Sequence, residues 1–150
     1  MKKILIAAIL CAGVIHAEES KTGVTALSPD VRALLSSEMR EIEKGMHSIF
    51  SDMIRGNYKS VSKTATQIQN SFIFKRNLTD AQRQELKIKI PKAFITLDRS
   101  FHETADKLAV AAEFGEVKGM QENFALMSSK CVQCHAKYAK HRFNNFKDED

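Results

Sequence analysis

The spacing of apolar residues in the first third of the chain is the feature that most constrains its fold. Six of them recur at alternating steps of four and three residues: Leu35, Met39, Ile42, Met46, Ile49 and Met53. This spacing places their side chains along one face of an α-helix that packs almost parallel to its neighbours. Ser28-Pro29-Asp30 is a typical helix start, with Ser28 as N-cap, and Gly56-Asn57 is a typical end. We therefore expect a long first helix between these two signals.

Similar spacing recurs in three later stretches, at about residues 60–75, 92–114 and 116–141. A short additional helix should open at Thr79, where Thr79-Asp80-Ala81-Gln82 is a capping box, and should stop or kink before Pro91. The inward face of the last stretch carries Met120, Phe124, Met127, Cys131, Cys134 and Tyr138. Four amphipathic helices with short connections predict an all-α fold, an antiparallel four-helix bundle.

The first residues are typical of an export signal. Residues 1–17 contain, in this order, two lysines, an apolar stretch from Ile4 to Ile15 and the small residue Ala17. The apolar stretch is too short to cross a bilayer. We predict that residues 1–17 are removed and that the protein is periplasmic and not membrane-spanning; the alternative is an N-terminal anchor that stays attached. The remaining organisation is a loose leader (18–27), the bundle domain (28–146) and an acidic tail (147–150).

The charge balance gives no support for nucleic-acid binding. The whole chain has a formal net charge of +5, but the export signal takes away Lys2 and Lys3 and no acidic residue, which leaves about +3. The sequence has no tryptophan, and no basic arm with interleaved aromatic residues. Nucleic acid is therefore not an expected partner.

Cys131, Cys134 and His135 form the motif Cys-x-x-Cys-His on the last predicted helix. A structural zinc site needs four ligands, usually two such pairs, and the mature chain has no other cysteine. A thiol–disulfide oxidoreductase uses Cys-x-x-Cys in a strand–helix setting, which this chain lacks. A disulfide across one helical turn would close only a very short loop and stabilise little.

Covalent haem attachment accounts for all three residues of the motif. The two thiols can form thioethers with the vinyl groups at one edge of a porphyrin, and the adjacent imidazole can then bind the iron. Attachment of this kind requires export, which the N-terminus predicts. We expect one haem c per chain, held by Cys131 and Cys134, with His135 as the proximal axial ligand.

With this motif near its C-terminus, the chain resembles the class II c-type cytochromes, the cytochrome c′ family. The resemblance covers essentially the whole mature chain and includes "FHETADKLAVAAEFGEVKGM", similar to the family's junction between its third and fourth helices, and the haem site "CVQCHAKY". It implies a bundle whose first helix supplies the residue opposite the proximal histidine. That residue is methionine in electron-transfer members and usually leucine or phenylalanine in gas-binding members. Members of the family often dimerise, so a homodimer is an open alternative.

Laying "EMREIEKGMHSIFSDMIRG" on the family pattern puts Met39 within one residue of this distal position. Met39 is therefore the candidate sixth ligand and Met46 the reserve, although methionines at this spacing also fill cores. His47 and His102 are expected to be ordinary polar or packing residues, with bis-histidine ligation of the iron through either one as the alternative. His141, six residues after His135 on the same predicted helix, is not expected to reach the opposite side of a haem. Gas-binding members commonly have arginine after the tyrosine that follows the motif; here Ala139 follows Tyr138, with Arg142 further on.

Three functions follow from these patterns, and none is enzymatic. The first is a low-spin electron carrier with Met39 on the iron, the second a five-coordinate protein that binds a small gas such as nitric oxide. The third is a helical interaction protein without haem. Basic residues surround the motif and could orient an acidic redox partner or simply form a solvated surface: Lys130, Lys137, Lys140 and Arg142.

Overall fold

The structure, a computed structural model of the chain, describes residues 22–146. Within this range the chain forms five α-helices and no β-strand, which confirms the all-α prediction. The predicted export signal and acidic tail lie outside the described residues. The helices are α1 (Pro29–Ile54), α2 (Tyr58–Asn70), α3 (Asp80–Lys89), α4 (Lys92–Glu113) and α5 (Val117–Tyr138), with short 3-10 helices η1 (Val24–Ala26) and η2 (Ile73–Lys75).

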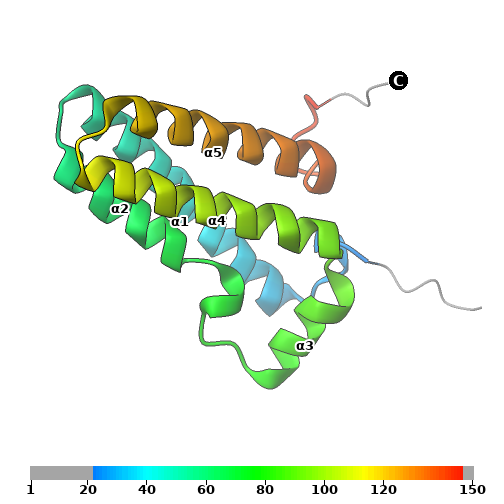
Figure 1. Cartoon of the computed structure of the whole chain (residues 1–150). Coiled ribbons are helices and arrows are strands. Elements are labelled where there is room, and N and C mark those ends of the chain that lie inside the picture. The colour runs from blue at the N-terminus through cyan, green and yellow to red at the C-terminus, as the bar shows by residue number, and fades with distance from the viewer. Residues whose placement is uncertain (1–21, 147–150) are drawn as a thin grey trace, which may run out of the picture.

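The four longer helices lie side by side, and the short helix α3 lies apart from them at one end (Figure 1). Helix α4 packs against both α2 and α5, and α1 packs against α2. Gly56 and Gly115 follow α1 and α4 with positive φ angles of 73° and 69°. Glycine adopts this conformation without steric cost, so both helices can end abruptly and the next helix can start within a few residues.

Several helix boundaries follow the sequence signals. Pro29 is the first residue of α1, and Pro91 immediately precedes α4. The Thr79 side chain accepts a hydrogen bond from the backbone N–H of Gln82, and the Gln82 side chain accepts one from the N–H of Thr79, which confirms the predicted capping box. The start of α1 differs from the prediction in the contacts of its N-cap residue. Ser28 is the N-cap residue, but its backbone N–H and its hydroxyl both donate to the carboxylate of Glu85 on α3, at 2.6 and 2.7 Å.

Two predicted helices are shorter than expected. Helix α2 ends at Asn70 instead of continuing to residue 75, because the chain turns to bury Phe72 and Ile73 and forms the separate 3-10 helix η2. Helix α5 ends at Tyr138 instead of residue 141, and residues 139–146 form turns. His141 therefore does not lie on the same helix as His135.

The segment before α1 is packed against the rest of the chain. Leu27 is 2% exposed, and the backbone N–H of Gly23 donates to the carbonyl of Lys89 at 2.7 Å. Gly23 and Leu27, which fall within the predicted loose leader, are therefore in contact with the rest of the domain.

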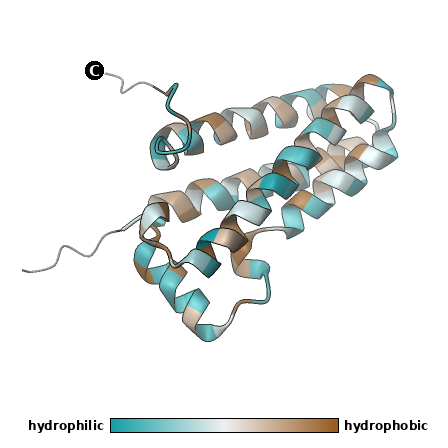
Figure 2. Ribbon diagram, turned by 180° about the vertical axis from the view of Figure 1, so that it is seen from behind, coloured by the Kyte–Doolittle hydropathy of each residue, from teal (hydrophilic) through white to brown (hydrophobic). Residues whose placement is uncertain are grey.

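Two clusters of buried apolar side chains hold the described part of the chain together. The first is formed by residues of α1, α2, α4 and α5 and includes Ile49, Leu108 and Met127; the second joins residues 27–35 to α3 and to the start of α4. Figure 2 shows apolar and polar residues mixed along the longer helices. This is expected of helices that turn one face to the core and the other to solvent. None of the described helices combines the length and the apolarity needed to cross a membrane.

Candidate functional site

A cavity of about 620 Å³ is lined by residues of α1, α4 and α5 and of the turn after α5. This volume falls within the range of about 300–1,000 Å³ that is typical of ligand and cofactor sites. Aromatic side chains of α4 and α5 line this cavity, among them Phe94, Phe101, Phe124 and Tyr138. Phe72 does not line it and packs against His102, with ring centroids 5.4 Å apart.

Both cysteines of the motif line the cavity as half-buried free thiols. Cys131 packs beside the first apolar cluster and Cys134 beside the second. Burial raises the pKa of the Cys131 thiol, and burial together with the charge of Asp98 raises the pKa of Cys134 to about 12. Reactive redox cysteines have lowered pKa values, because the thiolate is the nucleophile. These two side chains are therefore poor candidates for a thiol–disulfide redox couple.

His135 lines the same cavity from the last turn of α5. Its ring stacks on that of Phe143, with centroids 4.5 Å apart and planes inclined by 20°. Burial and the nearby charge of Arg142 lower the pKa of His135. A lowered pKa favours the neutral imidazole, which is the form that binds a metal ion.

The candidate distal ligands lie on α1. Met39 and Met46 both line the cavity that contains His135, and Met39 packs against both apolar clusters. Met53, the next methionine of the seam, does not line it. The structure thus brings together the motif on α5 and the methionines on α1, which are about ninety residues away in the sequence.

Histidines and cations also surround the cavity. His47 and His141 line it, and His141 reaches it because the chain leaves the helix after Tyr138. Lys130 and Arg142 contribute from the predicted basic cluster, and the Lys130 ammonium donates to the hydroxyl of Ser100 at 2.7 Å. The Lys137 ammonium lies 5.6 Å from the centre of the Tyr138 ring. Two of the four predicted basic residues therefore border the cavity directly.

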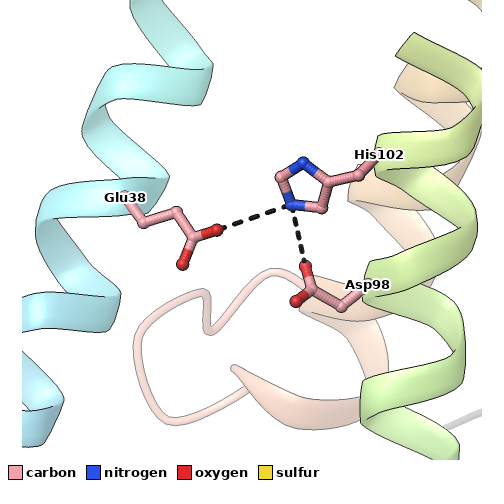
Figure 3. A group of neighbouring side chains, drawn as sticks. All are labelled: Glu38, Asp98 and His102. Carbon is pink, nitrogen blue, oxygen red and sulfur yellow. Dashed lines mark ion pairs between the residues drawn. The ribbon is translucent and has the colours of Figure 1, made fainter. Parts of the chain in front are cut away.

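A buried polar cluster lies beside the cavity, formed by Glu38 of α1 and by Asp98 and His102 of α4 (Figure 3). The Nε2 atom of His102 lies 3.4 Å from Oε1 of Glu38 and 3.6 Å from Oδ1 of Asp98. The three residues are 0%, 7% and 3% exposed. Nδ1 of His102 lies 2.6 Å from the backbone carbonyl of Ile68, to which it can only donate. Asp98 also lines the cavity, and Glu38 precedes Met39 in the chain.

Burial and the neighbouring charges shift the pKa values of Glu38 and His102 in this cluster. Burial raises the pKa of Glu38, since the carboxylate is removed from water. Burial alone would lower the pKa of His102, but the carboxylates of Asp98 and Glu38 outweigh it and raise that pKa to about 9. Sequence reasoning treated His102 as a packing residue and did not single out the two acids. The one available signal was Asp98 four residues before His102, which puts two polar side chains on the apolar face of a helix.

Comparison of the chain with known proteins gives no match to a protein-family model, to a curated protein or to a solved structure.

Proposed function

We propose that the protein is a periplasmic monohaem c-type cytochrome that carries single electrons, built as an antiparallel four-helix bundle. One observation supports this proposal above all. The three residues of the Cys-x-x-Cys-His motif line one cavity, and Met39 of α1 lines the same cavity. The motif thus has beside it the space that a large apolar cofactor needs and a second side chain able to bind iron.

The residues present fit a covalent haem. Cys131 and Cys134 would hold it through thioethers, His135 would be its proximal ligand, and Met39 would be the distal one. Once bound, the haem supplies the exchange of one electron between ferric and ferrous iron. Thioether sulfur on the iron raises the reduction potential relative to a second imidazole. Apolar and aromatic side chains that line the cavity, such as Phe94 and Phe101, would keep water from the metal.

The location and the partners of the protein follow from the same proposal. Thioether attachment requires export, and residues 1–17 are the predicted export signal. An iron with two protein ligands has no free position for a substrate, which suits an electron carrier. Lys130 of α5 and Arg142 of the turn after it border the cavity, and the exposed Lys137 also lies on α5. An acidic redox protein is the partner that such a positive rim would attract.

A second candidate function is the binding of a small gas such as nitric oxide to five-coordinate iron. Arg142 favours it, because this arginine lines the same cavity as His135 although it is displaced in the sequence. A cation in this cavity would stabilise partial negative charge on a small gas bound there. The two functions differ in whether Met39 occupies the sixth position.

A potentiometric titration of the purified chain, followed by optical absorption, tests the electron-carrier proposal. We expect a single reversible one-electron transition, low-spin spectra in both oxidation states, and no rapid change when carbon monoxide is added to the reduced protein. High-spin ferric bands and rapid carbon monoxide binding would instead support the gas-binding function. A colourless protein, after expression with haem-maturation machinery, would contradict both.

A further inference from the structure

The Glu38–Asp98–His102 cluster lacks the hydrogen bonds that would stabilise it as a purely structural network. Both carboxylate oxygens of Glu38, Oδ2 of Asp98 and Nε2 of His102 have no hydrogen-bond partner among residues 22–146. The separations of 3.4 and 3.6 Å from Nε2 to the two carboxylates are longer than ordinary hydrogen bonds of about 2.7–3.2 Å. Leaving several buried polar atoms unpaired costs free energy, so their convergence on one point needs an explanation.

The geometry suits ligands that share a metal ion. Two atoms bound to one tetrahedral cation at metal–ligand distances of 2.0–2.2 Å lie about 3.4 Å apart. The distances from Nε2 agree with this value, and the three ligand atoms all lie within 4.8 Å of one another. Glu38, from α1, points toward the two side chains on α4, so the cluster converges from two elements (Figure 3).

The hydrogen bond from His102 to the backbone prepares its ring for this role. Because Nδ1–H donates to the carbonyl of Ile68, the second proton of the ring is on Nε2, and a cation that displaces this proton would meet a lone pair directed at the carboxylates. Histidines that bind metals almost always donate their other ring N–H in this way, which fixes the tautomer and the ring orientation. A neutral imidazole, two carboxylates and a dication also sum to zero charge, which removes the cost of two buried anions.

We infer that Glu38, Asp98 and His102 form a binding site for one divalent first-row transition cation, of which Zn²⁺ is the representative. One imidazole and two carboxylates are donors that Zn²⁺ accepts, with the fourth position left for water. Asp98 also lines the cavity, so the proposed cation site is next to it. The cation site is separate from the haem iron, and it does not depend on the proposed electron transfer.

Zinc content of the purified full-length protein, measured after dialysis against Zn²⁺ and then against buffer, tests this inference. We expect one zinc per chain in the wild type. Glu38→Gln and Asp98→Asn keep the side-chain volume but remove a charged ligand, and each should weaken zinc binding at least tenfold. Glu103→Gln, an exposed acid beside His102, is the matched control and should bind zinc like the wild type.

Thermal unfolding, monitored by circular dichroism, separates loss of the ligand from loss of the fold. Without metal, Glu38→Gln should keep a cooperative unfolding transition, because the amide has nearly the volume of the carboxyl group. Added Zn²⁺ should raise the midpoint of the wild type and leave that of Glu38→Gln unchanged.

Two results would overturn the inference: a wild type without zinc, or equal zinc binding by the wild type and Glu38→Gln. Zinc that survives Glu38→Gln but is lost in Cys131→Ser would place the cation at the motif instead, and would count against the proposed haem as well. A zinc-free wild type that still carries covalent haem would overturn the cation site and leave the proposed function standing.

Discussion

Replacing both Cys131 and Cys134 with alanine is expected to abolish covalent haem in the exported protein. The two thiols are the only groups in the motif that can form thioethers, and both line the cavity in which a porphyrin would lie. Cys131 packs against the first apolar cluster and Cys134 against the second, so the haem would be attached where the two clusters meet. Staining of denaturing gels for haem peroxidase activity, with the amount of protein measured in parallel, gives the result directly.

The matched control for the cysteine variant lies between the two cysteines. Val132 is 53% exposed and Gln133 is also exposed, so alanine at either position should leave attachment unchanged. Each single cysteine variant should keep at most one thioether and lose most of the stained protein. Full staining of the double variant would show that the haem, if present, is not held by this motif.

Met39→Leu is expected to convert a low-spin ferric iron to a high-spin one. Leucine has nearly the volume of methionine but no sulfur to bind the metal, so the sixth position opens while the fold is retained. The substitution should cost less than about 1.5 kcal/mol in the free energy of unfolding. Optical and electron paramagnetic resonance spectra report the spin state, and a lower reduction potential and faster carbon monoxide binding should accompany the change.

Met46→Leu is the matched control, because Met46 lies on the same helix and lines the same cavity. It should remain low-spin if Met39 is the ligand. A spin change in Met46→Leu alone would transfer the role to Met46, and no change in either variant of a low-spin protein would point to His47 or His141. A wild type that is already high-spin would favour the gas-binding function.

The helices could be predicted where local chemistry determines them. The capping box at Thr79 depends on two side chains three residues apart, and Pro29 and Gly115 act on their own backbone conformation. The alternating four-and-three spacing likewise predicts the inward face of α1, and the family resemblance selects Met39, with Met46 in reserve, on that face; both line the cavity.

The parts that sequence reasoning missed depend on distant contacts. Residues 139–142 contain no glycine or proline and would extend a helix by propensity alone, yet the chain turns after Tyr138 and Phe143 stacks on His135. Glu85 could not be placed at the start of α1 from its position in the chain, because fifty-seven residues separate it from Ser28. Burial of Glu38 has the same cause: an acid on a helix is normally solvated, and here segments far away in the sequence, including His102 of α4, surround it.

The measurement that tests the central claim most directly is the intact mass of the exported polypeptide under denaturing conditions. We predict the mass of the chain cut after Ala17 plus one haem, and a fragment containing Cys131 and Cys134 that carries the whole addition. An exported chain with the unmodified mass of its amino acids, produced alongside functional haem-maturation machinery, would contradict the account.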